Sequence, residues 1–232
     1  MDVGELVRYG VPTIAVETFT ERGIIELTRV QERAIGIGVL EGKNVLVMAP
    51  TSTGKTLVGE VAALKHIVTR SGAVFLTSHK ALAYEKFITF RESYSQPGDK
   101  FFCHTALATG DQMTIEAAEE SVPLLVATYE KWYHMLLERP ERLKTRSLIV
   151  VDELQLLGNE HRGGKLEALL TWVKSKAPKT QIAGLSATFP EPEALAGWLD
   201  SEIVQVNKRP VPLKEQVFSN KGLFQLDRDN AP

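Results

Sequence analysis

The sequence predicts an α/β protein in which a mostly parallel β-sheet is covered by helices on both faces. Short apolar runs rich in valine, isoleucine and leucine alternate along the chain with segments of helical periodicity. The runs are almost continuously apolar, which is typical of strands buried on both faces. Together, the alternation and the apolar runs favour a parallel sheet between two layers of helices.

The composition is that of an ordinary globular protein. The chain has 232 residues, of which 44% are hydrophobic, enough for one large α/β domain or two small ones. Its formal net charge is −2, so any nucleic-acid binding must come from a local basic or N–H-rich surface. The single cysteine, Cys103, excludes an internal disulfide, and no apolar run approaches the roughly 20 residues of a bilayer span. We therefore expect a cytoplasmic or nucleoid-associated protein with no membrane partner.

The expected elements follow in chain order. Residues 1–9 form a short helix or strand, Pro12 begins an amphipathic helix that ends near Gly23, and residues 41–44 turn into the first buried strand. The expected strands are Val45–Met48, Ala73–Thr77, Lys100–His104, Leu124–Ala127, Leu148–Val151, Gln181–Leu185 and Ile203–Val206. The other expected helices are Arg29–Leu40, a helix opening at Thr56, Ala81–Phe90, Met113–Glu119, Tyr129–Glu138, one within Gly164–Ser175, and Glu193–Leu199.

The end of the chain departs from this alternation. Arg209-Pro210-Val211-Pro212 is typical of a boundary, and the two runs on either side of Asn220-Lys221-Gly222 predict a β-hairpin. We therefore divide the chain into residues 1–208, the α/β domain, and residues 209–232, the terminal hairpin.

Residues 45–56, VLVMAPTSTGKT, contain the strongest chemical signal. The buried strand is followed by a loop that opens a helix: Ala49, Pro50, Thr51, Ser52, Thr53, Gly54, Lys55 and Thr56. Unpaired N–H groups at such a helix N-terminus bind anions. Lys55 can reach the β- and γ-phosphates of a nucleotide, and the Thr56 hydroxyl can ligate a bridging Mg²⁺. Ala49 replaces the first glycine of the pattern G-x-x-x-x-G-K-[ST], and its small side chain still allows close backbone approach.

Two further groups of polar residues follow buried strands. Asp152 and Glu153 come directly after Val151, and Ser186-Ala187-Thr188 follows the next strand. Ligands in open α/β sheets bind at the carboxyl ends of strands, so the two carboxylates should face the phosphate loop. Asp152 would then anchor Mg²⁺, while Glu153 would orient and deprotonate an attacking water. Small hydroxyl residues such as Ser186 more often make turns or caps when they stand alone.

In combination, APTSTGKT (49–56), DELQ (152–155) and SAT (186–188) resemble the first three ATP-site motifs of superfamily II helicases. Further segments are similar to the Ski-like branch, which includes an archaeal DNA-repair helicase group: ERGIIELTRVQ (21–31), SHKALAYEKF (78–87), TGD (109–111), ATYEKW (127–132), RGGKLE (162–167) and RPVPL (209–213). The resemblance extends from about Pro12 to Leu226. It implies a RecA-like P-loop domain that uses ATP and Mg²⁺.

The resemblance also assigns roles beyond the ATP motifs. Gln31 would recognise adenine through its amide, which both donates and accepts hydrogen bonds. Lys80, the Thr109-Gly110 turn and Thr128 at a helix N-terminus would hold nucleic-acid phosphates. Gln155 replaces the histidine that is usual in this branch and would couple the two sites through Ser186, Ala187 and Thr188. Because an amide does not titrate near neutral pH, that coupling is expected to differ from the usual one.

A superfamily II helicase couples ATP hydrolysis to strand translocation and unwinding. ATP lies between two RecA-like lobes, and arginines of the second lobe reach the γ-phosphate. This chain carries the motifs of the first lobe only. The expected partners are therefore a second RecA-like lobe and single-stranded or partly duplex nucleic acid, with DNA favoured over RNA. Residues 209–232 would be the edge of the first lobe or the crossing toward the second.

Two other classes of function remain from the residues alone. A single lobe could bind single-stranded nucleic acid in a nucleotide-dependent way without being an enzyme. A P-loop kinase or GTPase-like switch is disfavoured, because the adjacent carboxylates supply a water-activating base and no acceptor-substrate motif is visible. Arg162, the arginine closest in sequence to the acidic pair, is expected to cap or orient the helix that carries Glu167. We accordingly expect almost no ATP hydrolysis by these 232 residues alone.

Overall fold

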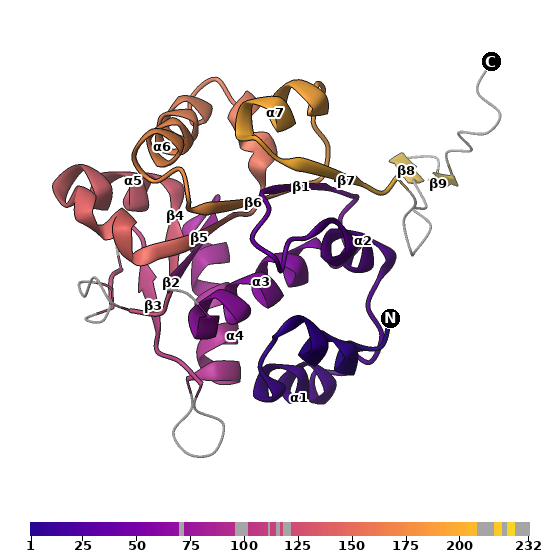
Figure 1. The fold of residues 1–232 in the computed structure, drawn as a ribbon. Coiled ribbons are helices and arrows are strands. Elements are labelled where there is room, and N and C mark those ends of the chain that lie inside the picture. The colour runs from indigo at the N-terminus through magenta and orange to yellow at the C-terminus, as the bar shows by residue number, and fades with distance from the viewer. Residues whose placement is uncertain are drawn as a thin grey trace.

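A parallel β-sheet forms the centre of the computed structural model, which describes residues 1–69, 72–95, 102–110, 112–114, 117, 122–207, 216–219 and 222–225. In this part of the chain the sheet has seven strands in the order β3-β4-β2-β5-β6-β1-β7, and every neighbouring pair is parallel (Figure 1). The strands are β1 (Val45–Met48), β2 (Gly72–Thr77), β3 (Thr105–Ala108), β4 (Leu124–Thr128), β5 (Arg146–Val151), β6 (Gln181–Ser186) and β7 (Glu202–Gln205). The predicted fold class is confirmed.

Helices cover both faces of the sheet (Figure 1). They are α1 (Thr13–Glu21), α2 (Arg29–Ile37), α3 (Lys55–Thr69), α4 (Lys80–Tyr94), α5 (Tyr129–Glu138), α6 (Gly163–Lys176) and α7 (Pro192–Leu199), with 3₁₀ helices η1 (Val3–Tyr9), η3 (Pro140–Thr145) and η4 (Leu154–Gly158). Residues of α1 to α4 pack in one buried apolar cluster and residues of α5 to α7 in another. The sheet therefore separates two cores, as strands buried on both faces require.

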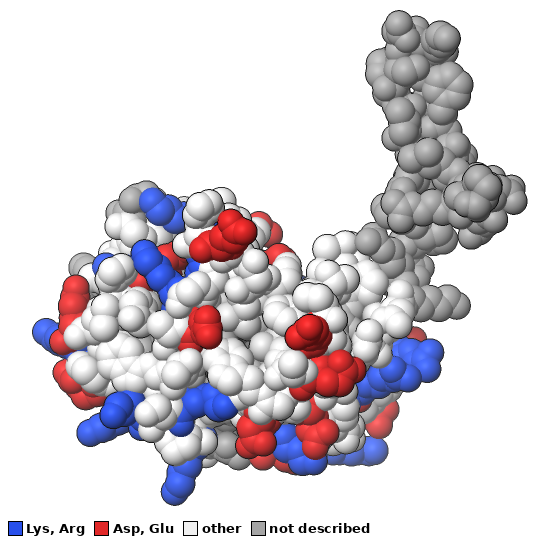
Figure 2. All heavy atoms as spheres, turned by 90° about the horizontal axis from the view of Figure 1, so that it is seen from above, with Lys and Arg blue, Asp and Glu red and all other residues white. Residues whose placement is uncertain are grey.

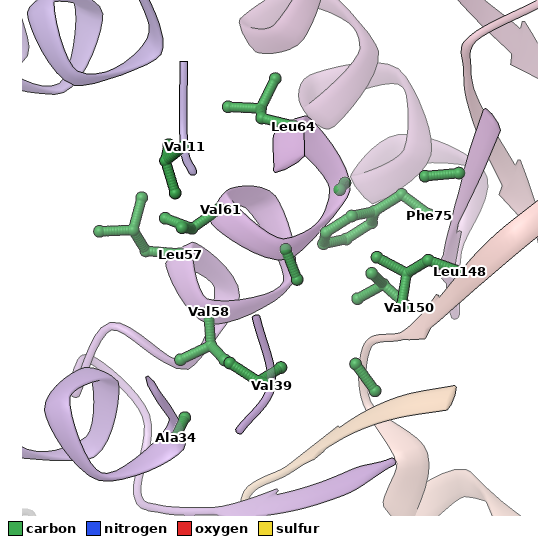
Figure 3. Packing of buried hydrophobic residues seen from close by; sticks show 14 of the residues in the cluster. Val11, Ala34, Val39, Leu57, Val58, Val61, Leu64, Phe75, Leu148 and Val150 are labelled. Carbon is green, nitrogen blue, oxygen red and sulfur yellow. The ribbon is translucent and has the colours of Figure 1, made fainter. Parts of the chain in front are cut away.

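Helix α3, which follows the phosphate loop, lies at the centre of the first core (Figure 3). Its apolar side chains, among them Val58 and Val61, are fully or almost fully buried. Gly59 allows the helix to lie directly against β5, because a Cβ at this position would be only 2.5 Å from Cγ1 of Val150. The start of α3 is thereby fixed relative to the strands on either side of the loop.

Helix ends explain most boundary differences from the predicted elements. The helix that begins after Pro12 ends at Glu21, and Gly23 follows with a φ of +80°. Helix α2 ends at Ile37 because Gly38 adopts a left-handed φ of +112° and donates its N–H to the helix carbonyls. Residues 1–9, for which the sequence allowed a helix or a strand, contain η1.

Of the strand predicted at Lys100–His104, residues 100 and 101 lie outside the described residues. The prediction is wrong for residues 102–104, which are not in a strand, because β3 occupies Thr105–Ala108 instead. Helix α4 extends to Tyr94, and the N–H groups of Phe102 and Cys103 both donate to the Tyr94 carbonyl, at 2.8 and 3.0 Å. These two residues therefore close the end of α4 and cannot pair in the sheet. Most of the helix predicted at Met113–Glu119 lies outside the described residues.

The predicted hairpin is present as the antiparallel pair β8 (Gln216–Ser219) and β9 (Gly222–Gln225). The proline-rich boundary before it lies outside the described residues. The division of the chain at residue 208 stays a prediction.

Candidate nucleotide and nucleic-acid site

Three predicted motifs lie at the carboxyl ends of adjacent strands. Strand β6 lies between β5 and β1, so Ser186 stands between the acidic pair and the phosphate loop. The Ala49 N–H donates to the Ser186 carbonyl at 3.1 Å. On the other side, the Ser186 hydroxyl donates to Oε1 of Gln155 at 3.0 Å. The strand order thus brings together residues that are more than a hundred positions apart in sequence.

The phosphate loop is held in a specific backbone conformation. Ser52 and Gly54 have positive φ values of 66° and 84°. The Thr53 hydroxyl donates to the Pro50 carbonyl at 2.8 Å, and the Thr28 hydroxyl donates to the Thr53 carbonyl at 2.9 Å. Position 54 favours glycine because its φ of +84° is strained for other residues, and a Cβ would also lie 2.3 Å from the amide nitrogen of Gln31 and force that side chain to shift. Successive turns of this kind direct backbone N–H groups toward a bound anion.

Lys55 lies over the loop that precedes it. Its ammonium donates to the Pro50 carbonyl at 2.9 Å and to the Ala49 carbonyl. Thr56 follows on the first turn of α3 and is half-buried. Both side chains are therefore placed where the N-terminus of α3 meets the loop, and the lysine would exchange carbonyl oxygens for phosphate oxygens on binding an anion.

Asp152 is held close to the end of β5. Its N–H donates to the Leu76 carbonyl at 2.9 Å, and its Oδ1 accepts from the Glu153 N–H at 3.0 Å. Burial raises the pKa of Asp152 above its ordinary value, and the neighbouring Glu153 carboxylate raises it further. A cation beside this carboxyl group would favour its ionised form, which is the chemistry of a metal anchor.

Glu153 is in the left-handed backbone region, with φ 59° and ψ 42°. Such a conformation costs a non-glycine residue about 1–3 kcal/mol, and residues of this kind cluster at active sites. Nε2 of Gln155 donates to the Glu153 carboxylate, while Oε1 accepts from Ser186 Oγ and, at 3.2 Å, from the Ala187 N–H. Because an amide nitrogen cannot accept from Ala187, the Gln155 side chain has one favourable orientation, with its donor toward Glu153.

Gln31 lies beside a cavity of about 590 Å³ next to the phosphate loop. Its Oε1 accepts from the Thr28 N–H at 2.8 Å, and its Nε2 donates to the Gly54 carbonyl at 2.9 Å. One N–H and one lone pair of the amide remain for a ligand. The cavity is lined by Arg22, Gly23, Ile24, Ile25, Glu26, Thr28, Gln31, Gly54, Thr56, Leu57, Glu60 and Lys86.

Sequence reasoning missed the ion pair at the edge of this cavity. Glu60 of α3 is only 3% exposed and pairs with the Arg22 guanidinium, whose Nη2 lies 3.4 Å from Oε2. The Tyr94 hydroxyl donates to Glu60 Oε1 at 2.6 Å. A buried carboxylate needs such partners, so the pair ties the Arg22–Glu26 segment to the helix of the phosphate loop. The available signal was an acidic residue within an otherwise apolar stretch of α3.

A second cavity, of about 730 Å³, lies at the ends of β2 and β4 and contains three of the four residues predicted to hold nucleic acid. Lys80 is exposed at the start of α4, and a Cβ on Gly110 would lie 3.3 Å from the Lys80 Cε. Thr128 caps α5 by accepting from the Lys131 N–H at 3.4 Å. The lining consists of Ser78, His79, Lys80, Gly110, Thr128, Glu130, Lys131, His134, Glu138 and Arg162.

Thr109 does not line this cavity. Its hydroxyl donates to the Gln112 carbonyl at 3.2 Å and accepts from the Gln112 N–H at 3.1 Å. The side chain therefore stabilises its own turn, and only the turn itself is presented at the cavity, through Gly110.

Of the two roles expected for Arg162, to cap or to orient the helix that carries Glu167, capping is wrong and orienting stays a prediction. Arg162 occupies the N-cap position of α6 but makes no side-chain capping hydrogen bond. An arginine side chain carries only donors, so it cannot satisfy the N–H groups at a helix N-terminus. Its guanidinium instead donates to Glu130 and to the Ser78 carbonyl.

Charges of both signs lie on one face of the molecule. Figure 2 shows lysines and arginines interspersed with aspartates and glutamates on the face seen there.

The described residues contain no group of three or more His, Cys, Asp or Glu side chains that could hold a metal ion by themselves. No helix among them combines the length and hydropathy needed to cross a membrane.

The parallel sheet and the loop after β1 define a RecA-like P-loop domain. A solved structure of S. cerevisiae Dbp5 bound to RNA and ADP BeF3 superposes with a TM-score of 0.72 at 16% identity, covering 85% of this chain and 51% of that one. A likeness at this identity shows the fold, and the fold agrees with the predicted one.

Sequence comparison identifies the family. The family model described as DEAD/DEAH box helicase matches residues 28–195. The chain is 37% identical over 228 residues to the ATP-dependent DNA helicase Hel308 of Pyrococcus abyssi, which covers 98% of this chain and 30% of the relative. It is 39% identical over 208 residues to the Hel308 of Thermococcus kodakarensis, covering 89% of this chain and 18% of the relative. The chain belongs to the DEAD/DEAH box helicase family.

A third relative, the probable ATP-dependent helicase MJ1401 of Methanocaldococcus jannaschii, is 34% identical over 216 residues, covering 92% of this chain and 26% of the relative. The chain spans no more than 30% of the length of these three curated relatives. The predicted resemblance to helicases of the archaeal branch is confirmed.

Proposed function

We propose that residues 1–208 are the ATP-binding lobe of an ATP-dependent nucleic-acid helicase, and that residues 209–232 lead toward a second RecA-like lobe. The observation that carries this proposal is the meeting of the phosphate loop, the acidic pair and Ser186–Thr188 at three adjacent strand ends. The Hel308 relatives, named as ATP-dependent DNA helicases, support it. DNA is accordingly the favoured nucleic acid.

In this function, residues 49–56 bind the phosphates of ATP. Backbone N–H groups of the loop and the Lys55 ammonium bind the β- and γ-phosphates. Gln31 recognises the adenine through the amide N–H and the oxygen lone pair that are not used in its hydrogen bonds to Thr28 and Gly54. The 590 Å³ cavity beside Gln31 receives the base. The Arg22–Glu60 pair fixes the wall of that cavity.

The residues present fit a magnesium ion. Mg²⁺ is usually bound through one or two carboxylates, substrate phosphates and waters, so a cluster of protein ligands is unnecessary. Asp152 supplies a partly buried carboxylate whose pKa is raised, and Thr56 supplies a hydroxyl at the N-terminus of α3. When bound, the ion would neutralise charge on the phosphates.

Glu153 is the proposed general base. The carboxylate takes a proton from a water as the water oxygen bonds to the γ-phosphorus and the bond to the β-phosphate oxygen breaks. Gln155 holds this carboxylate on one side and contacts Ser186 and Ala187 on the other. The amide therefore links the base to the Ser186–Thr188 segment, which we propose couples hydrolysis to movement on nucleic acid.

Nucleic acid is proposed to lie across the 730 Å³ cavity. Lys80, the Thr109-Gly110 turn and the N-terminus of α5 at Thr128 would hold backbone phosphates. Contacts of this kind do not depend on base sequence.

Binding of single-stranded DNA by this chain is expected to be weak, independent of base sequence and lost as salt rises. The reason is that phosphate contacts release counterions, with a slope of about −0.7 per neutralised phosphate on single strands. Fluorescence anisotropy of labelled oligonucleotides of different sequence, measured over a salt series, checks this. Affinity that resists salt or prefers one base sequence would contradict the proposed contacts.

A further inference from the structure

The N-terminus of α5 is held from two sides by its first two residues. The Tyr129 hydroxyl donates to the backbone carbonyl of Asp152 at the end of β5. The next residue, Glu130, contacts a different segment: its Oε1 accepts from Nε and Nη2 of Arg162 at 2.9 and 2.7 Å. The helix that Thr128 caps is therefore anchored both to the acidic pair and to the start of α6.

Arg162 joins three segments that are distant in sequence. Besides Glu130, its Nη2 donates to the Ser78 carbonyl, and its Nη1 lies 3.3 Å from Nδ1 of His79. Ser78 and His79 connect β2 to α4, Glu130 begins α5, and Arg162 precedes α6. All four residues line the 730 Å³ cavity.

The geometry of this contact depends on the shape of the guanidinium. Its planar donors meet the Glu130 carboxylate through two N–H groups and the Ser78 carbonyl at the same time. A lysine ammonium can donate to more than one acceptor, but it lacks this rigid, two-pronged geometry. The side chains of Arg162 and Glu130 are 28% and 29% exposed, so the pair is partly shielded from water. A contact of this kind sets the spacing between two helix N-termini, those of α4 and α5.

We propose that Glu130 and Arg162 are positioning residues for nucleic acid: the pair holds the Ser78–His79 segment and the N-terminus of α5 at the separation that consecutive backbone phosphates require. This inference rests on the proposed function, because it takes the cavity to be the nucleic-acid site. The competing explanation is that Arg162 attracts phosphates and Glu130 repels them, each as an independent charge.

Glu130→Gln separates the two explanations by the sign of its effect. It removes a negative charge from the cavity, so independent charges would tighten binding of single-stranded DNA. If the pair acts by positioning, the same substitution should weaken binding, because the neutral glutamine amide holds Arg162 less firmly than the carboxylate does. We expect binding to weaken by about fivefold or more, within the range measured for directly coupled pairs. Anisotropy of a fluorescein-labelled oligothymidylate at low salt gives the affinities.

Glu85→Gln is the matched control. Glu85 is an exposed glutamate on α4 and does not line the cavity. Removing its charge is expected to leave DNA binding unchanged. Arg162→Lys keeps the charge but loses the planar donors, so it should weaken binding about as much as Glu130→Gln. The double variant should be no weaker than Arg162→Lys alone, because the contact with Glu130 is already lost in that variant.

The affinity for a fluorescent nucleotide and the thermal unfolding midpoint are also measured on every variant. A variant that is misfolded would lose DNA affinity, nucleotide affinity and thermal stability together. Loss of DNA binding alone supports positioning. Tighter binding by Glu130→Gln, or unchanged binding by Arg162→Lys, would overturn the inference and leave the proposed function intact. Absence of DNA binding by the unsubstituted chain at low salt would overturn the proposed function itself, and this inference with it.

Discussion

Replacing Glu153 with glutamine is expected to slow ATP turnover by about 10²- to 10⁴-fold, the usual contribution of general acid–base catalysis. The assay needs a protein in which this chain is joined to a second RecA-like lobe. Glutamine has the shape of glutamate but cannot take the proton of the attacking water. Nucleotide affinity should be retained, because the substitution leaves the phosphate loop unchanged. Steady-state phosphate release and a fluorescent-nucleotide titration measure the two quantities.

Two further variants define the role of the carboxylates. Glu160→Gln changes an exposed glutamate shortly after the same strand and should leave turnover unchanged. Asp152→Ala should instead weaken the Mg²⁺-dependent part of nucleotide binding, because it removes the proposed metal anchor. Equal turnover in the unsubstituted protein and in Glu153→Gln would show that Glu153 is not the base.

The 232 residues alone are expected to hydrolyse ATP about 10³- to 10⁵-fold more slowly than the same chain joined to a second RecA-like lobe, the range attributed to a transition-state arginine. Charge that develops on the γ-phosphoryl group must be neutralised from outside the phosphate loop. Of the described arginines that line the two cavities, Arg22 is paired with Glu60, and Arg162 with Glu130. Neither guanidinium is directed to the phosphate loop by its hydrogen bonds.

Phosphate release is measured with saturating Mg·ATP and single-stranded DNA, first on the chain alone and then with the second lobe supplied in cis or in trans. Adding that lobe should restore hydrolysis. Light scattering establishes that the chain is monomeric in the assay. DNA-stimulated turnover near about 1 s⁻¹ by the monomer, a rate within the typical enzyme range, would place the catalytic charge within this lobe.

Much of the fold and of the nucleotide site could be predicted, because the decisive signals are local. The continuous apolar strands, the glycine and lysine of residues 54–55 and the acidic pair at the end of β5 are each visible in a few consecutive residues. Because ligands in open α/β sheets bind at the carboxyl ends of the strands, the phosphate loop and the acidic pair are expected on the same side of the sheet. Strand β3 was misplaced because Phe102 and Cys103 suit a strand at least as well as Thr105–Ala108, and their hydrogen bonds to the Tyr94 carbonyl cannot be seen in the sequence.

The contacts between distant segments could not be predicted. Glu60 and Arg22 are 38 residues apart, and Arg162 and Glu130 are 32 apart. Each pair forms only when the helices pack on the sheet and bring the two segments together. The strand order β5-β6-β1 places Ser186 between the acidic pair and the phosphate loop. Residues 186–188, which look like a simple turn in the sequence, therefore connect the two motifs through hydrogen bonds. Strand order is a property of the whole sheet, and local sequence does not encode it.

The central claim is that the loop after β1 binds the phosphates of an adenine nucleotide. Equilibrium titration of the chain with a fluorescent ADP in the presence of Mg²⁺ tests it most directly, with Lys55→Ala as the variant. Lys179→Ala is the control, because Lys179 is exposed and precedes β6, so it lies at the amino ends of the strands, away from the phosphate loop at their carboxyl ends. The account predicts weak binding that competes with ATP, is lost in Lys55→Ala and is retained in Lys179→Ala. Equal affinity in Lys55→Ala and the unsubstituted chain would contradict it.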